Sequence, residues 1–209
     1  MEQRKTNLIK HTKYIYEYQN AVDDDTVETI DFVLGREVTT LKPDVAYMDY
    51  TRNNNGWTLS MFQKKNKNIF DINQALENIG YKFLTQYYKD CPLVREYHKP
   101  HGTIGSFMTY RVYNEKDQYN WHTDASHEYK FLVALIIYLN DDFDGGDLLF
   151  LNDKIKVSPK KGSILMFPCG PYFVHKSTPI RSGRKSIIWD CYIDVPKALS
   201  EILLEGRDK

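Results

Sequence analysis

The stretch KFLVALIIYLNDDFDGGDLLFLN, residues 130–152, shows the pattern from which the fold can be predicted. Two runs rich in branched and aromatic residues flank a cluster of Asp and Gly, a composition typical of strands joined at a bend. We expect Gly145 and Gly146 to form a hairpin turn there, because glycine readily adopts the positive φ angles that such turns need.

The same pattern continues on both sides of this stretch. The runs GTIGSFMTYRVY, KIKVSP, GSILMFP and SIIWDCYIDV are strand-like and separated by Asn, Asp, Gly and Pro clusters. They are too short, and too free of intervening helical patterns, for a Rossmann sheet. We therefore predict a mainly β fold with flanking helices, whose core is a double-stranded β-helix (jelly roll) over residues 101–195.

Residues 1–100 are more polar and contain two helical patterns. DDDTVETIDFVLG opens with acids typical of an N-cap and ends in Gly35, and residues 70–91 carry apolar side chains at a spacing of three and four. RNNNGW (52–57) and KKNKN (64–68) are expected to be loops. We predict a single domain over residues 1–209: a helical and loop layer over residues 1–100, the core, and a C-terminal tail over residues 196–209.

Composition and charge limit the class of function. Lys plus Arg and Asp plus Glu number 28 each, so the formal net charge is zero, which disfavours a nucleic-acid partner. No apolar run approaches the roughly 18 residues of a membrane span, and the charged N-terminus lacks the apolar core of a signal peptide. Cys91, Cys169 and Cys191 form no C-x-x-C pair, and we expect reduced thiols in a cytoplasmic protein.

Two histidines and an acid form a candidate metal site. His122 and Asp124 lie two residues apart, so on an extended strand both side chains point to the same face. His175 follows about fifty residues later, after the run GSILMFP. Two imidazoles and one carboxylate form the facial triad of non-haem ferrous oxygenases, and zinc hydrolases use the same donors. The residues alone leave iron, zinc and a metal-free surface pair open.

A ferrous site that uses 2-oxoglutarate (2OG) also needs a cation deep in its pocket, to pair with the distal carboxylate of 2OG. Lys185, ten residues after His175, and its neighbour Arg184 are the candidates. On a strand, Lys185 points to the same face as Trp189, which we expect to face the core, whereas Arg184 points away. We therefore favour Lys185, with a solvated basic turn as the alternative interpretation.

Three ordered blocks, YNEKDQYNWHTD, YLNDDFDGGDLLF and HKSTPIRSGRK, together resemble the 2-oxoglutarate and iron(II)-dependent oxygenases, in particular the prolyl 4-hydroxylase branch. The matching features are Tyr113 and Tyr119, nine and three residues before His122, the segment Y-L-N-x-x-x-x-G-G from residue 138, and the spacing of Lys185 from His175. The resemblance covers residues 104–195. It departs at Lys116, where the branch has glycine.

The resemblance implies that His122, Asp124 and His175 bind Fe(II). Lys185 would pair with the distal carboxylate of 2OG, helped by the hydroxyl of Tyr138, and Tyr113 would hydrogen-bond 2OG near the metal. The implied reaction is hydroxylation of an unactivated C–H bond, with O2 as oxidant and decarboxylation of 2OG to succinate and CO2. Ascorbate is a further candidate cofactor. The expected target is a prolyl residue of a peptide or protein, and the alternative is a free amino acid or another small metabolite.

Three other functions share parts of this pattern. A non-catalytic jelly roll that only binds a ligand has no reason to keep the triad and Lys185 together. A zinc hydrolase needs a general base, and no glutamate is identifiable near the histidines. Demethylation of an alkylated base uses the same core, but the zero net charge disfavours it.

Overall fold

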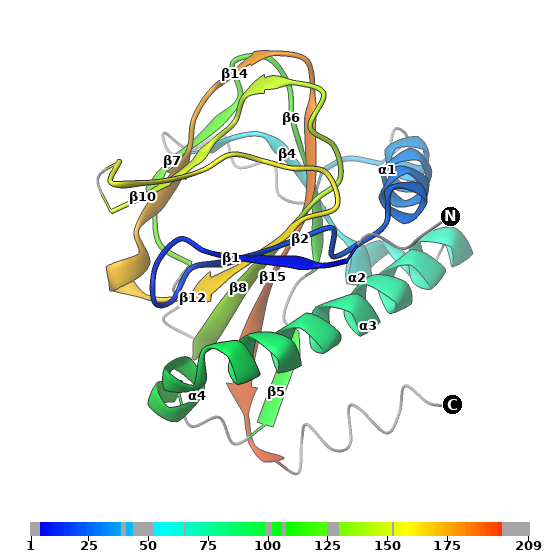
Figure 1. Cartoon of the computed structure of the whole chain (residues 1–209). Helices are drawn as coiled ribbons and strands as arrows, with labels where there is room; N and C mark the ends of the chain where they lie inside the picture. The colour runs from blue at the N-terminus through cyan, green and yellow to red at the C-terminus, as the bar shows by residue number, and fades with distance from the viewer. Residues whose placement is uncertain are drawn as a thin grey trace.

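The chain is described by a computed structural model over residues 5–38, 41–43, 52–64, 66–98, 102–105, 108–124, 130–151 and 153–197. Strands from both halves of the chain form two facing sheets, and helices lie outside the larger sheet (Figure 1). This is the predicted mainly β fold with flanking helices. The predicted tail from residue 196 falls almost entirely outside the described residues.

The larger sheet has eight strands and contacts the helices. Its order is β1–β2–β12–β8–β15–β6–β4, with β5 paired to β15. The strands are β1 (Asn7–Lys10), β2 (Tyr16–Gln19), β4 (Asn55–Thr58), β5 (Gly102–Gly105), β6 (Thr109–Tyr113), β8 (Phe131–Tyr138), β12 (Ile164–Pro168) and β15 (Lys185–Val195). Most neighbours are far apart in the sequence, so the sheet forms only when the whole chain folds.

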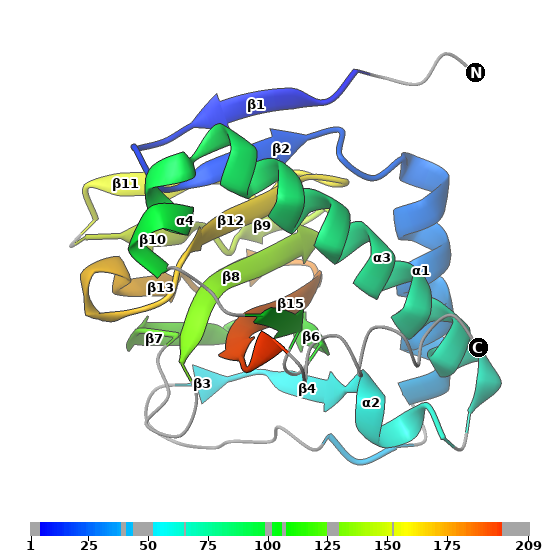
Figure 2. The same cartoon turned by 90° about the horizontal axis from the view of Figure 1, so that it is seen from below.

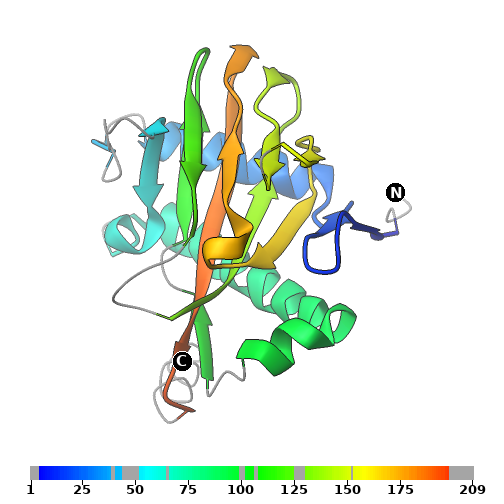
Figure 3. The ribbon, with the colours of Figure 1, turned by 90° about the vertical axis from the view of Figure 1, so that its left-hand side faces the viewer.

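The smaller sheet has five strands in the order β11–β10–β13–β7–β3, and a two-stranded sheet, β14–β9, lies beyond it. These strands are β3 (Arg52–Asn53), β7 (Gln118–His122), β9 (Asp144–Gly145), β10 (Leu148–Phe150), β11 (Ile155–Val157), β13 (His175–Ser177) and β14 (Ile180–Ser182), with the short helix η1 (Pro171–Phe173) before β13. Figure 3 shows these strands in front of the larger sheet, with the long helices behind both.

Side chains of the larger sheet alternate between two hydrophobic cores. On β15, Ile187 and Cys191 belong to the core between the sheets, whereas Ile188 and Tyr192 belong to the core under the helices. Because each face of an extended strand shows every second residue, one strand serves both cores. A sheet covered on both faces explains why β8 and β15 read as nearly continuous apolar runs.

Two long helices cover the outer face of the larger sheet (Figure 2). Helix α3 (Lys67–Asp90) begins at its N-cap Asn66, whose side chain accepts hydrogen bonds from the backbone N–H groups of Asn68 and Ile69 at 3.0 and 3.2 Å. Helix α1 (Asp24–Val38) runs past Gly35, where the sequence pattern predicted its end. The shorter helices are α2 (Leu59–Phe62) and α4 (Pro92–His98). Within the described ranges, every helix is too short or too polar to span a membrane.

The N-terminal region differs from the helix-and-loop layer that we predicted, because it also supplies strands to both sheets. RNNNGW, predicted as a loop, contains β3 and most of β4, which pair with β7 and β6 respectively. KKNKN is also not simply a loop, since its last residues cap and begin α3. These polar segments become strands through pairing with distant partners, which local propensity does not reveal.

Gly145 and Gly146 do not form the predicted hairpin turn. Strands β9 and β10 pair in order with β14 and β13, so they continue along one partner segment and the glycines only bend the chain between them. Their φ angles are 87° and 66°. A Cβ on Gly146 would lie 2.6 Å from Cδ1 of Ile180 and 3.1 Å from Cδ of Lys185. Glycine therefore allows the bend to approach Lys185 closely.

A glycine-to-alanine pair tests how α3 packs. Gly80 faces the larger sheet, and an added Cβ would overlap the hydroxyl oxygen of the buried Tyr192. We expect Gly80→Ala to lower the free energy of unfolding by roughly 1–3 kcal/mol, because this overpacking exceeds the gain in helix propensity. The measurement is urea denaturation of both variants and the parent.

The matched control is Gly35→Ala in α1, where the added Cβ meets no atom closer than 3.5 Å. There we expect a gain of up to about 1 kcal/mol from helix propensity. If Gly80→Ala and Gly35→Ala changed the free energy of unfolding by the same amount, that result would contradict the close contact between α3 and β15.

Candidate metal centre and its pocket

His122, Asp124 and His175 converge between the two sheets. His122 ends β7, and its partner in the antiparallel register is His175, the first residue of β13. Oδ1 of Asp124 lies 3.8 Å from Nε2 of His122, and Oδ2 lies 3.6 Å from Nε2 of His175. The potential ligand atoms of the three side chains lie within 4.8 Å of one another. One cation is therefore within reach of all three.

Both imidazoles are oriented for metal binding. Nδ1 of His122 donates to the carbonyl oxygen of Asn120 at 2.7 Å, and Nδ1 of His175 donates to that of Phe173 at 2.9 Å. Because a carbonyl only accepts, each Nδ1 carries the proton and each Nε2 presents a lone pair to the site. Burial, and next the nearby His175, lower the pKa of His122 to about 3, so its ring is in the neutral form that binds metals.

The carboxylate of Asp124 provides the test of whether the site fits a cation. Asp124 is buried, and its Oδ2 has no hydrogen-bond partner among the described residues. A buried carboxylate without such partners is costly, and a divalent cation between the three side chains would supply the missing interaction. The neighbouring Thr123 donates from Oγ1 to the carbonyl oxygen of Gly170 at 2.7 Å, which holds the backbone beside Asp124. The residues therefore fit a divalent metal.

Aromatic rings hold the two imidazoles in place. Tyr119 stacks on His122 with 3.5 Å between ring centroids and 14° between planes. Phe150 and Phe167 contact His175, with centroids at 5.3 and 5.0 Å. These contacts restrict rotation of the rings, so the Nε2 atoms stay directed at the site.

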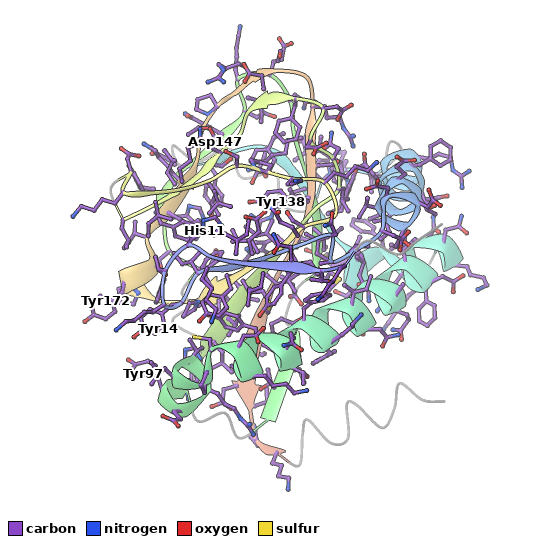
Figure 4. All side chains as sticks on the ribbon, in the orientation of Figure 1. His11, Tyr14, Tyr97, Tyr138, Asp147 and Tyr172 are labelled. Carbon is purple, nitrogen blue, oxygen red and sulfur yellow. The ribbon has the colours of Figure 1, made fainter. Side chains whose placement is uncertain are left out.

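A small cavity extends from the histidines into the core between the sheets. Figure 4 shows Tyr138 inside the space that the sheets enclose, whereas Tyr97 and Tyr172 project from the outer surface. Polar, charged and aromatic side chains line the cavity beside a few apolar ones: Arg111, Tyr113, Tyr119, His122, Ile136, Tyr138, Leu148, His175, Ser177, Lys185, Ile187 and Trp189.

Lys185 is the cation at the inner part of this cavity. Its Nζ donates to the carbonyl oxygen of Gly146 at 2.9 Å and to Oγ of Ser177 at 2.8 Å, and it lies 4.5 Å from the ring centroid of Tyr113. Since an ammonium has three N–H donors, one remains for a ligand. Burial lowers the pKa of Lys185 to about 7, against an opposing effect of Asp147. A negative ligand group would restore the charged form.

Arg184 lies on the opposite side of β15 and does not line the cavity. Its Nη1 is 3.2 Å from Oδ2 of Asp31 in α1, and its Nη2 donates to the hydroxyl of Tyr110. The two neighbouring cations are thus separated in the way that strand alternation predicts. Of these two cations, Lys185 alone lines the cavity.

The two tyrosines proposed from the sequence also line the cavity. Tyr113 is the register partner of Lys185, and Tyr138 ends β8 on the same side of the sheet. Burial raises the pKa of Tyr138, so its hydroxyl stays protonated and can donate a hydrogen bond. Lys116, where the resemblance implied a glycine, has a φ of 70°. The turn between β6 and β7 thus has a left-handed backbone angle at this position, which glycine adopts readily.

The sequence analysis missed Arg111. This residue is buried, and its Cζ lies 4.1 Å from the ring centroid of Trp189 and 6.0 Å from that of Tyr119. Strand alternation could have identified it, because Arg111 precedes Tyr113 by two residues on β6 and so shares its face. The pocket therefore holds two cations, of which the sequence analysis identified one.

Residues 108–192 match the family described as the 2OG-Fe(II) oxygenase superfamily. A protein of Acanthamoeba polyphaga mimivirus, whose own assignment as a prolyl 4-hydroxylase is provisional, is 36% identical over 64 residues. That match spans 27% of this chain and about a quarter (26%) of the viral protein.

Solved structures resemble the fold over most of the chain. A viral collagen prolyl hydroxylase from Paramecium Bursaria Chlorella virus-1, solved with 2OG, has a TM-score of 0.63 at 18% identity and covers 87% of this chain and 97% of its own. A prolyl hydroxylase from Trichoplax adhaerens, solved with a hypoxia inducible factor peptide, has a TM-score of 0.64 at 16% identity, covering 90% and 88%. A Pseudomonas putida prolyl-4-hydroxylase has a TM-score of 0.63 at 16% identity, covering 87% and 92%. At such identities these likenesses show the fold.

The fit of the three side chains to a cation predicts metal-dependent stability. We expect saturating Mn²⁺ to raise the melting temperature of the protein, because a ligand that binds only the folded state stabilises it. Asp124→Ala should abolish that rise, and without metal it should melt at the same or a higher temperature, since it removes a buried unpaired carboxylate. Differential scanning fluorimetry measures both effects.

The control is Asp144→Ala, which removes an exposed carboxylate paired with Arg181. This variant should keep the full metal-dependent rise. A rise that persisted in Asp124→Ala would exclude Asp124 as a ligand.

Proposed function

We propose that the chain is a 2OG-dependent dioxygenase of the prolyl 4-hydroxylase-like branch that hydroxylates an unactivated C–H bond, and the match of residues 108–192 to the 2OG-Fe(II) oxygenase superfamily supports this. In this reaction one oxygen atom of O2 enters the C–H bond, the other enters succinate, and 2OG loses CO2. The observation that carries the proposal is that the potential ligand atoms of His122, Asp124 and His175 lie within 4.8 Å of one another. The two histidines also line a cavity that contains the buried Lys185.

Several residues of the site have a proposed task that their surroundings support. The triad would hold Fe(II), which when bound supplies the activation of O2 that no side chain provides. Lys185 would donate its remaining N–H to the distal carboxylate of 2OG, beside the protonated hydroxyl of Tyr138. Tyr113 would hydrogen-bond 2OG nearer the metal. Ile136, Leu148 and Ile187 line the same space and would keep competing water out.

We propose a prolyl ring as the target, because the solved proteins that share this fold include prolyl hydroxylases. The ring would belong to a peptide or protein, as in the Trichoplax adhaerens complex with a peptide. A free amino acid or another small metabolite is the alternative, and ascorbate is a proposed reductant for the assay. A zinc hydrolase is less well supported, since none of the described residues that line the cavity is a glutamate that could act as general base.

The first test is spectroscopic and catalytic. Anaerobic protein with Fe(II) and 2OG should show the weak visible charge-transfer band of a 2OG chelate, and after admission of air it should release succinate. Asp124→Ala should lose both signals. A colourless complex would indicate a zinc site or a simple binding module, and succinate release that survived in Asp124→Ala would refute the ligand assignment. Product masses from a panel of proline peptides and free amino acids then identify the target.

The second test separates the two neighbouring cations. Lys185→Ala should weaken 2OG binding about 10- to 100-fold, the effect of losing a charged hydrogen bond in a buried site. Arg184→Ala should change it less than about threefold, because Arg184 contacts Asp31 and Tyr110 outside the cavity. Anaerobic titration of the chelate band gives the dissociation constants. If Arg184→Ala weakened 2OG binding more than Lys185→Ala, Arg184 would be the residue that pairs with the distal carboxylate of 2OG.

A pH series provides the control for charge. With a pKa of about 7 before 2OG binds, Lys185 is an ammonium below pH 7 and becomes neutral as the pH rises. The dissociation constant of 2OG should therefore be flat below pH 7 and rise toward about tenfold per unit above it. Lys185→Arg should remove the rise, since guanidinium stays charged. A flat wild-type profile to pH 9 would contradict the depressed pKa.

A further inference from the structure

A buried cation in the cavity has no role in the reaction scheme so far. Arg111 is only 5% exposed and lines the cavity together with the two histidines and Lys185. Within the described part of the chain it makes no ion pair and donates no hydrogen bond, and its Nε is buried without an acceptor. Desolvation of a guanidinium is costly when no partner compensates, so this position calls for an acceptor that the described residues do not provide.

Other arginines of the described residues show the usual arrangement. Arg184 pairs with Asp31, Arg181 with Asp144, and Arg36 with Glu37, and all three side chains reach solvent. Cζ of Arg111 instead lies 4.1 Å from the ring centroid of Trp189. A cation–π contact of this kind restricts the guanidinium and uses none of its N–H donors. The arrangement is that of a preorganised anion receptor.

Arg111 and Lys185 lie at different positions along the sheet. Both side chains project from the same face of the sheet, but Arg111 is the register partner of Ile187, two residues further along β15, and it lies beside Trp189. Tyr119 connects Arg111 with the candidate metal ligand His122, since its ring stacks on His122 and lies 6.0 Å from Cζ of Arg111. Lys185 can therefore hold the distal end of 2OG while Arg111 contacts a second molecule.

Charge counting indicates what that second molecule carries. With Fe(II) and 2OG bound, the three negative charges of Asp124 and 2OG balance the two of the metal and the one of Lys185. The positive charge of Arg111 is left over, among neutral tyrosines and imidazoles. In a water-poor cavity one further negative charge would be favoured, and a carboxylate matches the two parallel N–H donors of a guanidinium.

We propose that Arg111 binds a carboxylate of the substrate and thereby positions the carbon that is hydroxylated. The inference rests on the proposed function and narrows its substrate class: the target molecule bears a negative carboxylate close to the target ring. This carboxylate has two sources, the α-carboxylate of a free amino acid or an acidic side chain adjacent to a proline in a peptide. Arg111 is thus a specificity-determining residue that discriminates against substrates with a neutral group at this place.

The experiment compares probes that differ only in that charge. Anaerobic protein with Fe(II) and 2OG is titrated with L-proline or L-prolinamide, and with blocked tetrapeptides of sequence Gly-Asp-Pro-Gly or Gly-Asn-Pro-Gly. Binding is measured from the perturbation of the chelate band without turnover, and KM and kcat follow from succinate release in air. We expect the acid of one pair to bind at least tenfold more tightly than its amide, and the responding pair identifies the source of the carboxylate.

Three variants test whether the guanidinium of Arg111 causes the preference for the acid over the amide. Arg111→Met keeps the apolar contact with Trp189 and should reduce the acid-over-amide preference to less than twofold, through KM rather than kcat. Arg111→Lys keeps the charge without the planar fork and should retain part of the preference. The control Arg184→Met removes a guanidinium outside the cavity and should keep the wild-type preference. In all three, the affinity for 2OG should stay within about threefold of the wild type.

The outcomes separate this inference from the proposed function. If the wild type forms no chelate band, the proposed function fails. If the band forms but acids and amides bind alike, or no acid perturbs it, the carboxylate proposal is wrong while the oxygenase stands. If Arg111→Met weakens 2OG binding and keeps the preference, Arg111 serves the cosubstrate and the proposal is overturned. Should Arg111→Met fail to fold, Arg111→Lys and the wild-type probe pairs still decide.

Discussion

The pairing of β7 with β13 is the constraint on which the site depends. It sets His122 opposite His175 in the antiparallel register, although about fifty residues separate them. A shift of one residue would turn one imidazole to the outer face of the smaller sheet. The carbonyl groups that hold both Nδ1 atoms belong to the same two segments, at Asn120 and Phe173, so the register also orients the rings.

Buried charge is the second feature that connects fold and function. Asp124, Lys185 and Arg111 are each less than 10% exposed, and each lacks a paired ion at hydrogen-bond distance among the described residues. A fold that only needed stability would replace such groups with apolar side chains of similar size. Two well-packed hydrophobic cores on either side of the larger sheet stabilise the chain enough to tolerate them. The three charges therefore indicate what the cavity is built to bind.

Particular elements show where sequence reasoning succeeded and where it failed. The apolar runs of β8, β12 and β15 and the helical spacing of α3 were identifiable because burial leaves a local pattern. β3 and β4 were missed, since their polar residues become strands only by pairing with β7 and β6. Gly145 and Gly146 were interpreted as a hairpin turn, because their backbone angles are local but the partner strand of each flanking segment is not.

The sequence by itself predicted the mainly β core, the candidate triad of His122, Asp124 and His175, and the alternation that separates Lys185 from Arg184, because residue type and strand period are local properties. Only the tertiary structure decided that the two histidines share one cavity with Lys185, Tyr113 and Tyr138, and that Arg111 is buried there with no ion-pair partner among the described residues. Whether a charge is paired depends on every segment that folds around it, and no single stretch of the chain contains that information.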